Sequence, residues 1–514
     1  MANFDGQILF ALIVALALSW GISQLIARRY AGKVLQFMRQ PSALLEAGSP
    51  ANVHRAPSPS VANLQRQNRH AVWRLRTALA IVSILLALAV ALAAQAAYVD
   101  TGLGLRRTLT LTLIYAWISV PAIGLLERWS RGKIFLSSTA YMAAASLVVM
   151  LNSNGDQSLG WVLVWLFGEQ LPLLVFLFVT SGRTLRSVCP YLLLVFFPLT
   201  ASSLVGLGAL DTALGGGPDT WVVDLVMLTN SYVVFGLFSV APWLLAFYPL
   251  GRFARYLANA YRRKAFSEPL YLLAGLWAIA LIIQALTLSH SVGFKSYALL
   301  MAWLLIPLSS RLLKPWLRPR HQPPTLLLLR VFRGDDAMEK LFDSVVEKWR
   351  HSGNTLLIAG KDLALRNLEP DELFAFLSGH LQDRFICDRQ RLQAAIDDLD
   401  LQADPDGRYR VNEFFCYDNT WKGVLSMLVE RSDQVLMDLR GYNSQREGCT
   451  HELLVLAAMP HLRNIVLLFD RDTERQAVER MLANSTTHIR WLDCNALAPR
   501  QLQAETLAAL LAGE

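Results

Sequence analysis

The stretch SDQVLMDLRGYNSQREGCTHELLVLAAMPHLRNIVLLFD, residues 432–470, decides the fold of the carboxyl-terminal part of the chain. It contains a short apolar run at 434–439, a polar loop, an amphipathic segment at 447–459 and a second apolar run at 464–470. Short apolar runs separated by helices are typical of parallel strands covered on both faces. The stretch therefore predicts a strand, a helix and a second strand of one sheet.

The same alternation extends in both directions. Three further strands and three further helices are expected, the strands at 325–332, 354–360 and 488–493 and the helices at 339–350, 473–484 and 498–512. Five strands alternating with helices predict a flavodoxin-like α/β domain with a five-stranded parallel sheet over residues 321–514. Residues 362–419 are expected to be an insertion of two or three extra helices, with a polar DPDG turn at 404–407.

The loops that follow the strands are the candidate binding site, because such sheets hold ligands beyond the carboxyl ends of their strands. The first loop contains RGDD (333–336), and the loop after 434–439 reads RGYNSQREGCTHE (440–452). Each joins a glycine, which lets a ligand approach the backbone, to an arginine that can hold a phosphate. No GxGxxG or GxxxxGK motif is present, which argues against a Rossmann or P-loop nucleotide site. The candidate ligand-binding residues are Arg333, Gly334, Asp336 and Arg440.

Two blocks of this half resemble a TIR (Toll/interleukin-1 receptor) domain. VFRGDD (331–336) is similar to the first box of that family, an aromatic-ended strand followed by an arginine, a glycine and acids. Residues 432–456 are similar to its block of a serine, a buried strand, a loop, a cysteine and a Glu-Leu helix opening. The resemblance covers about 325–360 and 420–512, and Gly448 stands where the family commonly has a tryptophan.

The resemblance implies an activity. In the enzymatic branch of the family the glutamate that opens this helix cleaves NAD, and the matching residue is Glu452. NAD is then a substrate, no cofactor is required, and self-association through this domain is expected. A carboxylate near the ribose can stabilise an oxocarbenium-like state while Arg333 and Arg440 hold the diphosphate. The alternative is that Glu452 is an acid in the first turn of a helix, stabilised there by the helix dipole.

The amino-terminal half has a different composition. Residues 1–320 hold 26 Lys and Arg against 10 Asp and Glu, whereas residues 321–514 hold 22 against 30. With 54% hydrophobic and 17% charged residues, the chain is neither wholly soluble nor disordered. The basic excess lies in the half with the long apolar runs, so the lipid bilayer is the expected partner and nucleic acid is not.

Nine apolar runs in this half are long enough to cross a bilayer, which takes about 20 helical residues. They lie at approximately 8–26, 78–98, 108–126, 134–152, 160–180, 190–208, 226–248, 270–288 and 294–312. The expected organisation is a first span within 1–27, a basic cytoplasmic linker at 28–76 and a bundle of about eight spans at 77–313.

The loops between these runs predict the orientation. Alternate segments, beginning with 28–76, carry 19 Lys and Arg residues, and the opposite loops carry 3. Because short cytoplasmic loops retain positive charge, the amino terminus is expected outside and the carboxyl-terminal domain in the cytoplasm. The composition favours a multi-pass protein of a bacterial inner membrane.

Few residues suggest chemistry inside the membrane or at a metal. Glu169 lies within a span close to Pro172, where an ion pathway would place a carboxylate, but an isolated acid is more often paired or protonated. The five cysteines are scattered without paired spacing, so no zinc site, other metal site or disulfide framework is expected.

The sequence thus favours a membrane-anchored signalling or effector protein whose TIR-like domain assembles and cleaves NAD. A non-enzymatic nucleotide- or partner-binding module that regulates the membrane bundle is the alternative. A transporter with a regulatory tail has little support, since neither an internal repeat nor paired broken helices are evident.

Overall fold

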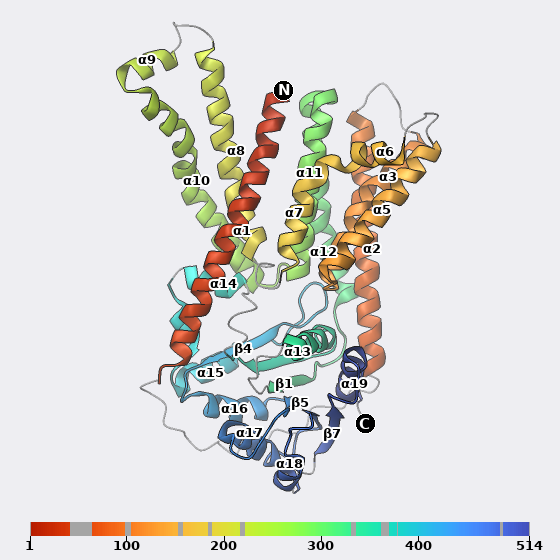
Figure 1. Cartoon of the computed structure of the whole chain (residues 1–514), viewed down its shortest axis with the longest axis vertical. Helices are drawn as coiled ribbons and strands as arrows, with labels where there is room; N and C mark the ends of the chain where they lie inside the picture. The colour runs from red at the N-terminus through yellow and green to blue at the C-terminus, as the bar shows by residue number, and fades with distance from the viewer. Residues whose placement is uncertain are drawn as a thin grey trace. The chain divides into compact units, whose positions relative to one another are not determined.

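The computed structural model describes residues 2–41, 64–97, 104–152, 158–182, 188–215, 221–329, 336–360, 370–377, 379–483 and 487–512. The chain divides into two compact units (Figure 1). The helical unit comprises Met1–Arg28, Arg76–Leu313 and Asn367–Phe374, and the sheet unit comprises Arg29–Leu75, Lys314–Arg366 and Ala375–Glu514.

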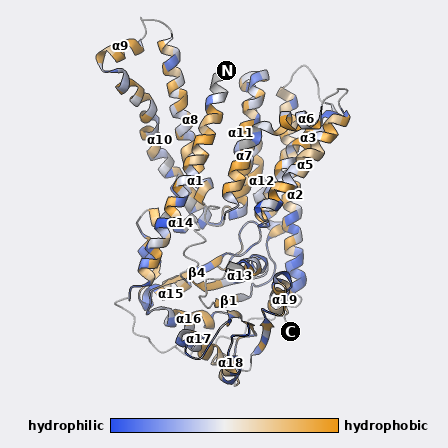
Figure 2. Ribbon diagram, viewed as in Figure 1, coloured by the Kyte–Doolittle hydropathy of each residue, from blue (hydrophilic) through white to orange (hydrophobic). Residues whose placement is uncertain are grey.

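The amino-terminal half consists of helices. They are α1 (Ala2–Met38), α2 (Leu64–Ala97), α3 (Leu105–Tyr115), η1 (Ala116–Ile118), α4 (Ser119–Leu126), α5 (Arg131–Asn152), α6 (Leu159–Phe167), η2 (Gly168–Gln170), α7 (Leu171–Thr180), α8 (Val188–Leu214), α9 (Trp221–Leu228), α10 (Ser231–Arg262), α11 (Glu268–Val292), η3 (Gly293–Leu304) and α12 (Leu305–Leu317). Figure 2 shows hydrophobic residues along the length of α7, α10 and α11.

Within the described residues, seven helical segments are long and apolar enough to cross a membrane, and an eighth is obtained if a bent pair counts as one span. The bent pair, Leu159–Phe167 with Pro172–Thr180, turns by 75°. The last of the seven segments, Glu268–Leu317, corresponds to two of the nine expected spans. Nine spans are therefore not obtained by helix length and composition alone.

Large apolar side chains cover the outside of several of these helices. On α9 and α10, Met227, Leu228, Tyr232 and Leu245 are each at least 78% exposed. Water-soluble proteins rarely expose contiguous apolar surface of this kind, whereas a lipid-facing helix requires it. The chain is therefore a membrane protein by the character of this unit.

The helices of this unit contact one another closely at small residues. The Thr200 hydroxyl on α8 donates to the Ala11 carbonyl on α1 at 3.1 Å, and the Ser203 hydroxyl donates to the Ser239 carbonyl on α10 at 2.8 Å. A Cβ at Gly206 would lie 3.2 Å from the Phe238 carbonyl. Small and hydroxyl-bearing residues at helix crossings are the usual way in which helices associate in lipid, where burial of apolar surface gives no driving force.

The sheet unit contains a seven-stranded parallel sheet in the order β3-β4-β2-β1-β5-β6-β7. The strands are β1 (Thr325–Leu329), β2 (Asn354–Ile358), β3 (Phe385–Ile386), β4 (Val411–Cys416), β5 (Gln434–Asp438), β6 (Asn464–Phe469) and β7 (His488–Asp493). The helices are α13 (Asp336–Trp349), η5 (Leu381–Arg384), α15 (Arg389–Asp397), α16 (Trp421–Glu430), α17 (Glu447–Ala457), α18 (Arg475–Leu482) and α19 (Pro499–Leu511), and α14 (Pro370–Leu377) is divided between the two units at residues 374 and 375.

Helices cover both faces of the sheet, as the apolar strands predicted. Alternate residues of β1 belong to two different cores: Leu327 and Leu329 pack with α15, α16, α17 and α18, whereas Leu326 and Leu328 pack with α13 and α19. Side chains in a strand point alternately to opposite faces, so both sets must be apolar when both faces are covered.

The expectation of five strands is wrong. The additional strands β3 and β4 come from the segment expected to be a helical insertion, 362–419. β4 pairs with β2, and β3 forms the edge beyond it. The segment gave no clear strand pattern because β3 has two residues and the first half of β4 carries Asn412 and Glu413, which are only half-buried. Burial of Phe414 and Phe415 stabilises β4 in the sheet.

Parts of the segment expected as a linker are helical and pack on the sheet unit. Leu64, at the start of α2, is buried in the core that contains α13 and α19. The Asn68 amide donates to the Lys348 carbonyl and to the Ser352 hydroxyl, both at 2.7 Å. On the last turns of α1, Tyr30 contacts Phe376 edge-on, with the ring centroids 5.8 Å apart.

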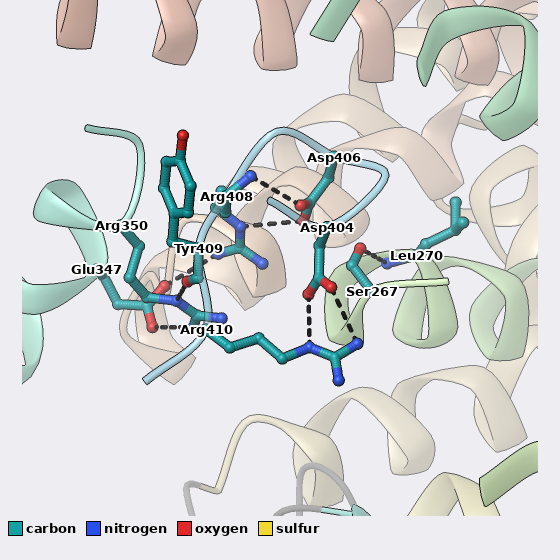
Figure 3. Close-up of polar contacts among 9 residues, drawn as sticks. All are labelled: Ser267, Leu270, Glu347, Arg350, Asp404, Asp406, Arg408, Tyr409 and Arg410. Atoms are coloured by element: carbon teal, nitrogen blue, oxygen red, sulfur yellow. Dashed lines mark hydrogen bonds and ion pairs between the residues drawn. The ribbon is translucent and has the colours of Figure 1, made fainter. Parts of the chain in front are cut away.

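A buried ionic network holds the DPDG turn (Figure 3). Arg408 donates to Asp406 at 3.0 Å and to Glu347 on α13 at 3.0 Å. Arg410 makes a two-point contact with Asp404, at 3.1 and 2.9 Å. Both acids of the turn and both arginines are buried. Each ion pair therefore offsets part of the hydration that its two members lose on burial.

The backbone of the same turn is fixed by two further features. Gly407 has φ of +81°, a left-handed conformation that favours glycine, and a Cβ there would lie 2.4 Å from the Leu317 carbonyl. The Arg350 guanidinium donates to the Tyr409 carbonyl at 2.6 Å and to the Glu347 carboxylate at 3.0 Å. The DPDG sequence is thus a structural turn.

Candidate functional site

The sheet topology places the candidate site between β1 and β5. From β1 the chain passes outward to β2 and β3, returns through β4, and then crosses to β5 on the other side of β1. Connections leave β1 and β5 in opposite directions, and open α/β sheets commonly bind ligands at the carboxyl ends of the strands at such a reversal. The loops at this point are those that follow Leu329 and Asp438.

The first of these loops lies largely outside the described residues. Arg333 and Gly334 belong to 330–335, which the structure does not describe. Asp336 is the first residue of α13, and its side chain also lies outside the description. The site can therefore be built from the β5 side only.

Arg440 lies at the expected edge, but its guanidinium is bound within the protein. Its Nε and Nη2 donate to the two carboxylate oxygens of Asp438 at 3.0 and 3.1 Å, and its backbone N–H donates to the same carboxylate. Asp438 ends β5 and is buried. In this conformation Arg440 neutralises Asp438, so the two-donor face expected to hold a phosphate is occupied.

Contacts with the neighbouring strand and helix fix the rest of the 440–446 loop. The Gly441 N–H donates to the Asp470 carboxylate at 2.8 Å, and Gly441 has a positive φ of 59°. Asp470 also accepts from the Thr473 hydroxyl at 2.9 Å. The buried Tyr442 hydroxyl lies 2.9 Å from the Thr450 hydroxyl on α17. The loop is thus tied to the end of β6 and to α17.

Glu452 lies in the second turn of α17, because the helix begins at Glu447. The interpretation of Glu452 as a first-turn acid is therefore wrong, and Glu447 occupies that position. The Glu452 side chain as a whole is partly exposed, but its Oε2 is buried and makes no hydrogen bond. Burial raises the pKa of Glu452 to about 8. At neutral pH the group is mostly an uncharged carboxylic acid, which the helix dipole does not stabilise.

Cys449 and His451 lie close to Glu452 on α17. Burial, together with the nearby Glu452 and Asp438 carboxylates, raises the pKa of Cys449 to about 12, and Arg446 opposes that rise. His451 contacts Trp421 edge-on at 5.7 Å, and its buried Nε2 makes no hydrogen bond. Burial, and then Lys422, lower the pKa of His451.

Trp421 occupies the space beside Gly448. A Cβ at Gly448 would lie 3.9 Å from the Trp421 ring. Trp421 begins α16, and it packs against the core that includes α17. The Trp421 indole of α16 therefore packs next to the first turn of α17.

The arrangement can carry out acid–base chemistry. A carboxyl with a pKa near 8 exchanges its proton close to neutral pH, the range that general acids and bases use. Asp470, which organises the loop together with Asp438, was not predicted as a site residue. It could have been found from its position directly after an apolar run, at the same edge of the sheet as Asp438.

No family model, curated protein or solved structure matches the chain.

Proposed function

We propose that this chain is a signalling or effector protein of a bacterial inner membrane, with nine spans, the amino terminus outside and the sheet unit in the cytoplasm. One hydrogen bond supports the proposed number of nine spans: the Trp303 indole donates to the Ala274 carbonyl at 3.0 Å. In one straight helix these residues would be about 43 Å apart. The segment Glu268–Leu317 therefore doubles back near Gly293, whose φ is +66°, and supplies two spans. The bent pair supplies one more.

Cysteine labelling in intact cells tests this orientation. Phe294→Cys should react with an impermeant thiol reagent because the position is exposed and on the expected outer side. Arg263→Cys, an exposed position in the basic segment after α10, should react only after the membrane is opened. Labelling of Arg263→Cys but not of Phe294→Cys in intact cells would mean that the orientation is the opposite of the one proposed.

The proposed activity of the sheet unit is NAD cleavage by a TIR-like domain that works as an assembly. The observation that carries it is the buried Glu452 carboxyl on α17, the helix that follows β5, which has an unpartnered oxygen and a pKa near 8. A buried polar atom without a hydrogen-bond partner destabilises a fold. Binding of a ligand is one reason why a protein keeps such an atom.

In the reaction, the bond between nicotinamide and ribose breaks and its electron pair leaves with the pyridine nitrogen, which loses its positive charge. Water adds to the ribose carbon and releases a proton. An ionised Glu452 would stabilise the oxocarbenium-like transition state. The rate should therefore rise with pH through about 8, because the carboxylate is the active form.

The second candidate is a non-enzymatic module that binds a nucleotide or partner and regulates the membrane bundle. The pairing of Arg440 with Asp438 favours it, because a preassembled catalytic site would leave the arginine free for the diphosphate. A binding module needs only that a ligand phosphate displace Asp438 from Arg440.

The purified full-length chain, incubated with NAD, separates the two candidates. Release of nicotinamide that falls at least about 100-fold in Glu452→Gln would support catalysis. Glu447→Gln is the matched control, because Glu447 is an exposed acid on the same helix and should keep its activity. No nicotinamide from the wild type, together with NAD binding that Arg440→Ala weakens, would favour the binding module.

A further inference from the structure

A small, mostly apolar cavity lies inside the helical unit. Side chains from α2, α3, η1, η2 and α11 line it, and its volume is about 10 Å³. Its polar lining comes from Gln170, Trp277, Gln284 and Tyr115, and the face of Trp117 is aromatic. The remaining lining residues are aliphatic. A volume of this size holds about one water molecule.

Two of these polar groups are buried without a hydrogen-bond partner. Trp277 is fully buried and its Nε1 makes no hydrogen bond, and Gln170 is 6% exposed with an unpartnered Oε1. The indole N–H can only donate and the amide oxygen can only accept. Gln284, by contrast, donates to the Tyr115 hydroxyl at 3.3 Å. The residues that line the cavity therefore include one donor and one acceptor without a hydrogen-bond partner.

The backbone around the cavity is interrupted at two places. η1 breaks the helix between α3 and α4, and η2 breaks it between α6 and α7 where the pair bends by 75°. Irregular backbone at membrane depth is tolerated where it is buried in protein or lines a cavity. Both breaks contribute lining residues, so they meet at one point in the bundle.

The chemistry of the lining selects the ligand. None of the lining side chains carries a formal charge, so an ion would lose its hydration without compensation. A molecule that accepts from Trp277 Nε1 and donates to Gln170 Oε1 satisfies both groups. Each unsatisfied group would otherwise destabilise the bundle, and the destabilisation is larger in an apolar surrounding.

We propose that this cavity is a binding site for one small uncharged molecule that donates and accepts hydrogen bonds, and that water is its occupant. The molecule bridges α11 to the bend between α6 and α7. The site is independent of the NAD chemistry proposed for the sheet unit, and it links the continuous helix α11 to the interrupted helix pair α6 and α7 through a removable contact.

Thermal unfolding of the full-length chain in detergent tests the site through Gln170→Met, which keeps the length of the side chain and removes its hydrogen bonds. The melting temperature should fall by on the order of 2 °C if a bridging molecule is lost. Gln284→Met should also lower it, because that change removes a direct hydrogen bond to Tyr115. An unchanged or higher melting temperature for Gln170→Met would overturn the proposal, since methionine is then preferred to an amide in a dry cavity.

A double variant, Gln170→Met with Trp277→Phe, separates the loss of a bridging molecule from the effect of altered packing. Trp277→Phe leaves space whatever the occupant, so its own destabilisation is not informative. Combined with Gln170→Met, it should lower the melting temperature by less than the sum of the two single changes, because both lose the same bridging molecule. Additive losses would contradict a shared molecule, as would an experimental map that resolves ordered waters elsewhere in the bundle and shows none here.

Discussion

The DPDG turn and the region around Glu452 both bury acidic side chains in the sheet unit. The acids of the turn are paired with arginines, whereas Glu452 is not paired with a cation. In the turn, Asp404 and Asp406 are paired with Arg410 and Arg408. Burial raises the pKa of Asp404, and the positive charge of Arg410 opposes that rise. Glu452 has no such cation, and burial alone raises its pKa to about 8.

The difference separates a structural use of buried charge from a candidate functional one. Removing one member of a paired network leaves the other buried and uncompensated, so a paired acid stabilises only together with its partner. A buried acid without a partner adds no such stability and stays neutral. An unpartnered buried carboxyl is therefore the better candidate for chemistry.

The largest effect is expected in the paired region. Arg408→Met leaves Asp406 buried without its cation and removes one partner of Glu347. The unfolding free energy should fall by about 3 to 5 kcal/mol, the usual loss when a buried pair is broken on one side. Denaturant unfolding followed by circular dichroism measures it.

Two companions sharpen this test. Asp406→Asn combined with Arg408→Met removes the stranded charge and should recover part of the loss. Glu479→Gln breaks an exposed pair with Arg475 and should leave the unfolding midpoint nearly unchanged. A single Arg408→Met variant as stable as the wild type would mean that the network does not hold the turn.

A smaller effect, dependent on pH, is expected at Glu452. Its folded pKa, about 8, is above the ordinary value of 4.5, so the folded state holds the proton more tightly than the unfolded state. The stabilisation is complete below about pH 4.5 and is lost as pH rises through 8. Glu452→Gln cannot titrate, so its unfolding free energy relative to the wild type should increase from pH 5 to 9, by on the order of a few kcal/mol.

Glu447→Gln controls for the position on the helix. This exposed first-turn acid interacts with the helix dipole, and its loss should lower the unfolding free energy by about 0.3 to 1 kcal/mol. Its difference from the wild type is the reference against which the pH dependence of Glu452→Gln is compared between pH 5 and 9. Parallel curves for Glu452→Gln would show that Glu452 is charged and hydrated in the folded chain.

Much of the sheet unit could be predicted from local pattern. The apolar runs at 434–439 and 464–470 coincide with β5 and β6, and the amphipathic segment from 447 coincides with α17. Such runs are readable because a strand buried on both faces must be apolar at every position. β3 and β4 could not be read in this way, since their pairing with β2, more than local hydrophobicity, stabilises them.

The sequence predicted which residues occupy the candidate site, but not their hydrogen-bond partners or their burial. Arg440 and Glu452 do lie in the loop and helix that follow β5. The sequence does not show that Asp438 holds Arg440, because that geometry depends on the bend of the chain after the strand. It also does not show that the Glu452 oxygen is buried, because neighbouring helices determine its desolvation.

By itself, the sequence determined that an apolar, basic half suited to lipid precedes an acidic half of alternating strands and helices, because hydrophobic periodicity and charge are local properties. Only the tertiary structure decided the order of seven strands, the reversal of the connections between β1 and β5, and the partners of each buried polar group. Whether Glu452 is charged, Arg440 is free or Gln170 is satisfied depends on atoms distant in the chain. Desolvation and hydrogen bonding act through space, so folding alone sets them.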